Sequence, residues 1–179
     1  MEFRTARLRL RSLRSTDRSA WIAGMEASAE LHGAWVPLVT LDASARFAAQ
    51  LAEHESGASW KGIALADDGR IAAWVNLNGI QRGVSQSANA GWSVSAAFAG
   101  QGMMVEAVGA LLDVAFAPEG VALHRVAAGI MPENARSLRV AAGCGFREEG
   151  FAPELVNIAG QWRDHRLFAK LAREHRPVG

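Results

Sequence analysis

The stretch GWSVSAAFAGQGMMVEA, from Gly91 to Ala107, combines a strand-like segment, a turn bracketed by two glycines and the start of a long apolar helix. Glycine adopts positive φ without strain, and its missing side chain lets a ligand approach the backbone. Such a turn at a helix N-terminus directs several backbone N–H groups outward, and the helix dipole adds partial positive charge there. The stretch therefore predicts a cradle for an anion, and a pyrophosphate is the anion that suits it best.

The spacing of the glycines excludes two common nucleotide-binding motifs. A dinucleotide-binding turn has a third glycine or alanine where this chain has Val105, and it follows an early strand rather than one in the middle of the chain. The phosphate-binding string G-x-x-x-x-G-K-S/T does not occur. On its spacing alone, the turn fits a structural connection between a strand and a helix as well as it fits a phosphate site.

Length and composition indicate one folded domain. The 179 residues can bury a full core, and we expect a single domain over residues 1–179. Hydrophobic residues make up 50% and charged residues 21%, and the net charge of +1 does not indicate a nucleic-acid binder. No apolar run is long enough to cross a bilayer and no secretion signal is evident, so the cytoplasm is the expected location. The single cysteine excludes an internal disulfide and a cysteine-based zinc site, and we expect no metal.

Hydrophobic periodicity and turn residues predict a mixed α/β chain. We expect loops over 30–39 and 78–89 and a hairpin turn at Asp67-Asp68-Gly69. The expected strands cover residues 6–13, 59–66, 70–78, 90–95, 123–130, 145–151 and 162–171. The expected helices cover residues 18–29, 42–55, 103–117 and a segment from 134 to 143 or 145.

A second group of motifs lies in the last third of the chain. It consists of Asn134-x-x-Ser137, the ending GFREEG over 145–150 and the segment GQWRDHRL over 160–167. With the G-Q-G turn and the Glu106-Ala107 pair, it resembles the GNAT superfamily of N-acetyltransferases. Within that superfamily the chain is most similar to the RimJ/RimL type, which acetylates the N-termini of ribosomal proteins. The resemblance also includes LRLRSLRSTD and LHRVAAGIMPEN, and it runs from about residue 7 to residue 171.

The resemblance implies a fold, a cofactor and an acceptor. The fold is a mixed, mostly antiparallel sheet of about seven strands flanked by about four helices, with acetyl-CoA between two splayed strands. The acceptor is a primary amine, in this type the α-amino group of a protein N-terminus; a homodimer is compatible, and neither a nucleic acid nor a membrane is expected as a partner. The alternatives are a small-molecule or peptide amine acetyltransferase and a non-catalytic acyl-CoA-binding regulatory protein. The cofactor-binding positions are Val94, Gly100, Gln101, Gly102, Met103, Met104, Asn134 and Ser137.

The chain departs from the family pattern at two positions. The usual glutamine or arginine three residues before the first glycine is Ala97 here, and the backbone cradle is expected to survive that loss. Many members also carry a tyrosine that protonates the leaving thiolate; its position is Ala141, and the chain contains no tyrosine. Ser137 is the nearest candidate for that role, and water is the alternative. Glu154 is the candidate general base, although the RimL-like carboxylate aligns nearer Val156.

Simpler roles remain open for several of these residues. Asn134 suits a helix N-cap, Ser137 a hydrogen bond to the backbone, and Glu154 a solvated surface carboxylate.

Other polar residues have two interpretations as well. Asp164 and His165 could be a metal or proton-relay pair, or members of an ion-pair network with a neighbouring arginine. Cys144 lies between two glycines and is expected to be a buried small residue rather than a nucleophile. His32 and Trp35 fall in the loop where the family binds acceptors, and they are the candidate substrate-binding residues.

Overall fold

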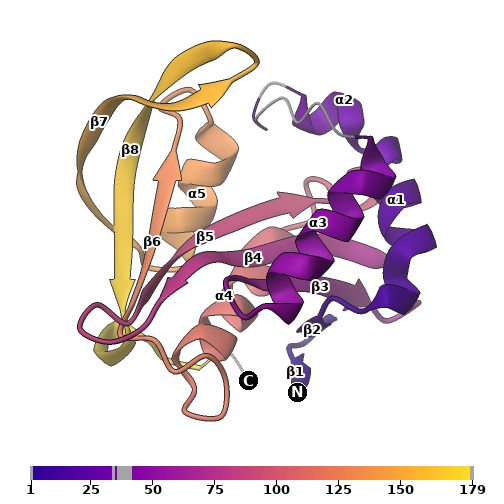
Figure 1. Cartoon of the computed structure of the whole chain (residues 1–179), viewed down its shortest axis with the longest axis horizontal. Helices are drawn as coiled ribbons and strands as arrows, with labels where there is room; N and C mark the ends of the chain where they lie inside the picture. The colour runs from indigo at the N-terminus through magenta and orange to yellow at the C-terminus, as the bar shows by residue number, and fades with distance from the viewer. Residues whose placement is uncertain (1, 34, 36–41, 178–179) are drawn as a thin grey trace.

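The computed structural model describes residues 2–33, 35 and 42–177, and it builds them around one eight-stranded sheet (Figure 1). The sheet order is β1-β2-β3-β4-β5-β6-β8-β7, and every neighbouring pair is antiparallel except β5 and β6. This arrangement is the mixed, mostly antiparallel α/β fold that the resemblance implied. The strands are β1 Glu2–Arg4, β2 Leu8–Ser12, β3 Trp60–Ala66, β4 Ile71–Gln81, β5 Ser87–Val94, β6 Arg125–Ile130, β7 Arg147–Ile158 and β8 Gln161–Leu171.

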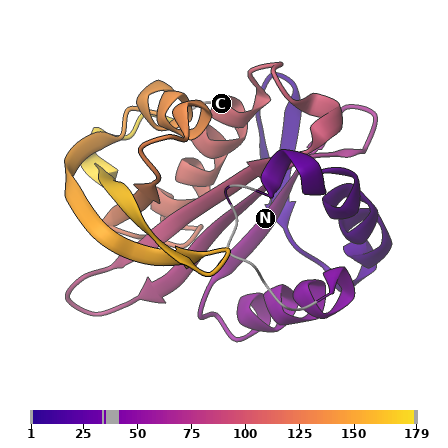
Figure 2. The same ribbon diagram turned by 90° about the horizontal axis from the view of Figure 1, so that it is seen from above.

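Helices cover both faces of the sheet (Figure 2). Along β3, Ile63 and Leu65 point to one face, where they pack with Trp21 of α1 and Phe47 of α3. Ala64 points to the other face and joins the core formed with α4 and α5. None of the described helices is long and apolar enough to cross a membrane. They are α1 Arg18–Ala27, α2 Ala29–His32, α3 Ala43–Glu55, α4 Met103–Phe116 and α5 Ala135–Gly143.

A buried ion pair fixes the passage from β2 into α1. Arg11 of β2 donates from Nη1 and Nη2 to the two carboxylate oxygens of Asp17, at 2.8 and 2.6 Å. The Asp17 carboxylate also accepts the backbone N–H of Arg14 at 2.8 Å. Burial would raise the pKa of Asp17, but the bonds from Arg11 and Arg14 and the charge of Arg11 outweigh it and hold that pKa below its usual value. The carboxylate is therefore ionised in the folded protein, and both of its oxygens accept hydrogen bonds.

The structure corrects the predicted elements at several strand ends. β1 was not predicted, because three residues are too short to show alternation. The expected loop over 78–89 is partly strand, since β4 continues to Gln81, which pairs with Ser87 at the start of β5. The expected loop over 30–39 begins inside the single turn of α2, and its residues 34 and 36–39 lie outside the described part of the chain.

The last hairpin is longer than the sequence suggested. Its strands were expected over 145–151 and 162–171, but β7 continues to Ile158 and β8 begins at Gln161. Pro153 interrupts the strand pattern, because proline cannot donate a ladder hydrogen bond. The β7–β8 ladder accommodates it with a shift in register between Ala152 and Val156. The extension projects the hairpin tip toward the end of α2 (Figure 1).

Candidate active site

β5 and β6 run side by side only at their first residues and then diverge. Their parallel pairing covers 87–89 of β5 and 125–127 of β6. Beyond these pairs β5 stays bonded to β4 as far as Val94, and β6 stays bonded to β8 as far as Ile130. The two strands separate visibly in Figure 1. Beyond the paired residues, the facing edges of β5 and β6 are not bonded to each other, and we call the space between them the slot. Main-chain groups along the slot can therefore bind an extended ligand.

The glycine turn lies directly after β5 and is open on its outer side. Gly100 and Gly102 both have positive φ, +78° and +74°. Gly102 is the N-cap of α4, and no side chain of the described residues caps the first turn of that helix. A Cβ at Gly100 would meet nothing within 4 Å, and one at Gly102 would meet only the Arg7 guanidinium at 4.0 Å. An uncapped helix N-terminus behind an open turn fits a phosphate group.

Arg7 holds this turn against the start of the sheet. Its Nη1 donates to the Gln101 carbonyl at 3.0 Å and its Nε to Glu106 Oε2 at 2.8 Å. Glu106 also accepts the backbone N–H of Arg7 at 2.7 Å and the hydroxyl of Thr5. Burial would raise the pKa of Glu106, but these hydrogen bonds and the Arg7 charge keep it lowered. The Glu106 carboxylate is therefore ionised and paired with Arg7, and the guanidinium of Arg7 lies beside the turn.

The end of β5 is held by the α1–α2 segment. The His32 Nε2–H donates to the Val94 carbonyl at 2.8 Å, and the Ala96 N–H donates to the Ser28 hydroxyl at 3.0 Å. Burial lowers the pKa of His32 more than the bond to Val94 raises it, so the ring is neutral at neutral pH. His32, predicted to contact the acceptor, is 9% exposed and contacts the strand proposed to bind the cofactor.

α5 brings Asn134 and Ser137 to the other side of the slot. The Asn134 Oδ1 accepts the backbone N–H of Ser137 at 3.0 Å, which is the helix-capping role considered from the sequence. The Ser137 hydroxyl makes no hydrogen bond to the described residues and is partly exposed. Ala141, at the family's tyrosine position, is 0% exposed and packs in the core.

A hollow of about 450 Å³ lies between the end of β5 and α5. Ala96, two residues after Val94, lines it on one side, and Arg136, next to Ser137, lines it on the other. Ala27, Glu30 and Leu31 of the α1–α2 segment complete the wall. The hollow therefore lies beside two of the positions that the resemblance assigned to the cofactor, Val94 and Ser137, although neither of them lines it.

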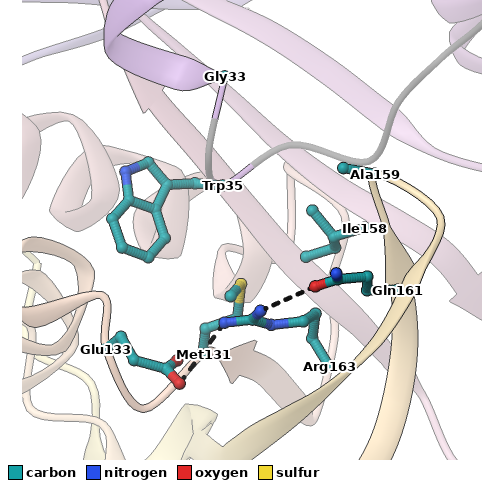
Figure 3. A pocket seen from close by; sticks show the side chains of 8 residues that line it. All are labelled: Gly33, Trp35, Met131, Glu133, Ile158, Ala159, Gln161 and Arg163. Carbon is teal, nitrogen blue, oxygen red and sulfur yellow. Dashed lines mark hydrogen bonds and ion pairs between the residues drawn. The ribbon is translucent and has the colours of Figure 1, made fainter.

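A second cavity, of about 220 Å³, lies at the tip of the β7–β8 hairpin (Figure 3). It is bounded by the hairpin, the residues after α2 and the turn between β6 and α5. Trp35 lines it, so one of the two predicted acceptor residues borders a cavity. Glu133 and Arg163 also line it, and sequence reasoning did not single out Glu133. The full lining is Gly33, Trp35, Met131, Glu133, Ile158, Ala159, Gln161 and Arg163.

Glu154 lies outside both cavities. It is exposed in the irregular part of β7 with φ +48°, and its N–H donates to Asp164 Oδ1 at 2.8 Å. A positive φ at a non-glycine residue costs about 1–3 kcal/mol, so Asp164 stabilises an unfavourable backbone conformation. Asp164 therefore supports the hairpin, and the adjacent His165 is buried with its Nδ1–H donating to the Arg163 carbonyl at 2.9 Å.

Comparison with known proteins decides the family. The sequence profile of the Acetyltransferase (GNAT) domain matches residues 7–147, which is most of the chain. The protein belongs to the GNAT acetyltransferase family.

Individual members of this family are similar over most of the chain. Probable N-acetyltransferase YjcK of Bacillus subtilis is 43% identical over 110 residues, covering 62% of this chain and 60% of that protein. The [Ribosomal protein uS5]-alanine N-acetyltransferase of Escherichia coli is 33% identical over 117 residues, covering 65% and 59%. The match thus spans about 60% of the length of these curated relatives. The structure of Mycobacterium smegmatis RimJ in complex with CoA-disulfide superposes with a TM-score of 0.84 at 30% identity, covering 93% of this chain and 83% of that one.

The single cysteine of this GNAT chain provides a test of its burial. Cys144 donates from Sγ to the Val105 carbonyl at 3.4 Å, and burial raises the pKa of its thiol to about 11. Because the thiolate is the reactive form, each pKa unit lowers the reactive fraction tenfold. We expect the native protein at pH 8 to react with an aromatic disulfide reagent at least about 100-fold more slowly than the urea-unfolded protein. Equal rates in the two states would contradict the burial of this thiol.

Proposed function

We propose that the chain is an acetyl-CoA-dependent N-acetyltransferase that transfers an acetyl group directly to a primary amine. The observation that carries the proposal is the slot between β5 and β6 with an open glycine turn at its end. The turn has positive φ at Gly100 and Gly102, no side-chain cap and a guanidinium beside it. These features suit a ligand that pairs with main chain at one end and carries a pyrophosphate at the other.

The residues of the proposed site form two groups, one that binds the cofactor and one that faces the leaving thiol. Gly100, Gln101, Gly102, Met103 and Met104 hold the pyrophosphate with backbone N–H groups, which need no counter-charge. Val94, at the end of β5, binds the pantetheine and polarises the thioester carbonyl; a backbone donor aimed at that oxygen stabilises the developing oxyanion. Asn134 and Ser137 face the thiol end from α5.

We propose the α-amino group of a protein N-terminus, in particular of a ribosomal protein, as the acceptor. The proposal is supported by the similarity to the Escherichia coli relative, a uS5-alanine N-acetyltransferase. An α-amino group has a pKa near 8, so a useful neutral fraction exists at pH 7 without a strong base. The unbroken sheet from β1 to β7 supports treating 1–179 as a single acetyltransferase domain, and the cytoplasm is the proposed location.

The chain's own residues have limited proton-transfer tasks. Acetyl-CoA, when bound, supplies the acetyl thioester, and its thiol is a good leaving group. The unpartnered Ser137 hydroxyl is the proposed donor to that thiolate. Glu154 remains the sequence-derived candidate base, although it lines neither cavity. A water molecule can take the amine proton instead. The reaction would then lack the rate increase of about 10²–10⁴-fold that a positioned base gives in typical enzymes.

Replacing Ser137 with alanine tests its role. We expect kcat to fall about 10-fold to 100-fold, a modest loss for a proton donor because the thiol is already a good leaving group, while the Kd for acetyl-CoA changes less than about threefold. The helix should persist, because Asn134 caps it through the backbone N–H of residue 137 rather than through the hydroxyl. A change in Kd with kcat unaltered would make Ser137 a binding residue only.

The proposed activity is tested by two measurements on the whole chain. Calorimetric titration with acetyl-CoA measures binding, and release of free thiol is then followed over a panel of α-amines, lysine peptides, polyamines and amino acids. We expect saturable binding and thiol release with α-amine peptides, with the acetyl group found on the N-terminus by mass spectrometry. Binding without turnover on any amine would favour a regulatory acyl-CoA-binding protein, and turnover only on small amines would move the acceptor to that class.

A further inference from the structure

The cavity at the tip of the β7–β8 hairpin is lined by one acidic and one basic side chain, Glu133 and Arg163, whose ion pair is long. Arg163 Nη2 lies 3.5 Å from Glu133 Oε1, and Arg163 Nη1 lies 3.4 Å from Gln161 Oε1 (Figure 3). Charge-assisted bonds are normally about 2.7–2.9 Å long. On the same strand, Arg166 Nε donates to Glu148 at 2.7 Å. Arg163 is therefore held less tightly than its neighbour and retains donors for another ligand.

The exposure of this pair argues against a purely structural role. The Glu133 side chain is 60% exposed and that of Arg163 is 35% exposed. Exposed ion pairs contribute little to stability, because solvent screens them and the side chains lose conformational freedom. The remaining walls are mainly apolar, with Met131, Ile158 and the Trp35 ring. Two opposite charges in a mostly apolar cavity are the arrangement expected of a recognition site.

Position links the pair to the proposed reaction. Glu133 immediately precedes Asn134, which caps α5 and is a candidate cofactor contact. Arg163 lies on the opposite wall, on β8. An amine drawn toward Glu133 would thus be brought to the turn from which α5 starts. The cavity volume, about 220 Å³, is below the roughly 300–1,000 Å³ typical of pockets for drug-sized ligands, and it suits a chain terminus.

From this geometry we propose that Glu133 and Arg163 select an acceptor that carries an amine and a carboxylate close together, namely a peptide N-terminus with an acidic side chain within its first three residues. When such an acceptor binds, the long Glu133–Arg163 ion pair is replaced by two others. The ammonium of the acceptor pairs with Glu133 and its carboxylate pairs with Arg163, so no charge is left unpaired. A polyamine offers only cations, so Arg163 would face like charge in the cavity. The inference rests on the proposed acetyltransferase activity and narrows its acceptor.

The test compares three peptides that begin with alanine and differ only at their second residue, which is aspartate, asparagine or lysine. For the wild-type chain we expect kcat/KM to fall about tenfold from aspartate to asparagine and further to lysine, with spermidine below the lysine peptide. Free aspartate is included to separate a peptide acceptor from an amino acid. Equal kcat/KM for the three peptides would overturn the inference while leaving the acetyltransferase proposal intact. A better rate with free aspartate would overturn the peptide assignment.

Substitutions at Arg163 test whether this residue causes the preference for the aspartate peptide. Arg163→Gln should abolish it, and Arg163→Glu should reverse it so that the lysine peptide becomes the better substrate. Arg166→Gln is the matched control, because that guanidinium pairs with Glu148 outside the cavity, and it should keep the wild-type order. Reversal in the control, or an unchanged order in both Arg163 variants, would contradict the assignment.

A binding measurement keeps the inference testable without turnover. The same peptides are titrated into the protein saturated with CoA, which cannot transfer an acetyl group. The aspartate peptide should bind at least about fivefold more tightly than the lysine peptide, and equal affinities would contradict the selection. If tighter binding is seen but no amine releases thiol, the charge selection stands as a binding property and the proposed catalysis fails.

Discussion

Gly102→Asp is expected to lower the affinity for CoA by at least about 100-fold while the chain remains folded. The substituted carboxylate would stand at the N-terminus of α4, where the pyrophosphate is proposed to bind. Two unit charges about 4 Å apart repel by about 4 kcal/mol at the effective dielectric constant typical of a protein surface. A loss of about 2.7 kcal/mol already corresponds to 100-fold in affinity. Charge repulsion alone therefore accounts for the expected effect.

The neutral control for this substitution is Gly102→Asn. Asparagine and aspartate have similar shape, and both tolerate the positive φ of +74° better than other side chains do. We expect the asparagine variant to lose no more than about tenfold in affinity. The aspartate variant brings a second carboxylate toward Arg7, which already binds Glu106, so circular dichroism and thermal melting should accompany the titration. Unchanged CoA affinity in a folded Gly102→Asp variant would refute the cradle.

The largest effect on stability is expected from Asp17→Asn. This change removes the charge that Arg11 binds through two hydrogen bonds, in a pair whose side chains are 11% and 10% exposed. Breaking a buried ion pair by removing one partner typically costs about 3–5 kcal/mol, because the other charge is left without compensation. Urea unfolding at pH 7 should show a free energy of unfolding lower by about that amount.

The pH dependence of the same variant gives a second check. The pKa of Asp17 is lowered in the folded state, so its contribution is complete above the unfolded pKa of about 3.9 and is lost as the pH falls through the lower folded pKa. The gap in stability between wild type and Asp17→Asn should therefore narrow below about pH 4. Asp68→Asn is the matched control, since Asp68 pairs with Arg70 on the surface, and we expect no measurable change in midpoint. A comparable loss in both variants would contradict the importance of burial.

Much of the fold was predictable because its signals are local. Alternation of Leu8 and Leu10 with arginines gives β2, and the apolar run after Gly102 gives α4. β1 and the extension of β7 past Pro153 were missed, since one is too short for a pattern and the other depends on an irregular ladder. Local sequence does not reveal such irregularities.

The candidate site was predictable in its backbone parts and much less so in its side chains. The glycine turn and the capping pair, Asn134 and Ser137, have fixed spacings that a sequence displays. The Arg7–Glu106 contact joins residues that are 99 positions apart in the sequence, and no local pattern predicts it. Similarly, nothing in the sequence singled out Glu133, and only the three-dimensional arrangement puts it at a cavity.

The most direct test of the proposed cofactor site is a crystal structure of this chain grown with CoA. We expect the pyrophosphate within hydrogen-bonding distance of the backbone N–H groups of residues 101–104, and the pantetheine extended along β5 toward Val94 and Ser137. CoA ordered elsewhere on the molecule, or a glycine turn left empty at a CoA concentration that saturates binding in solution, would contradict it.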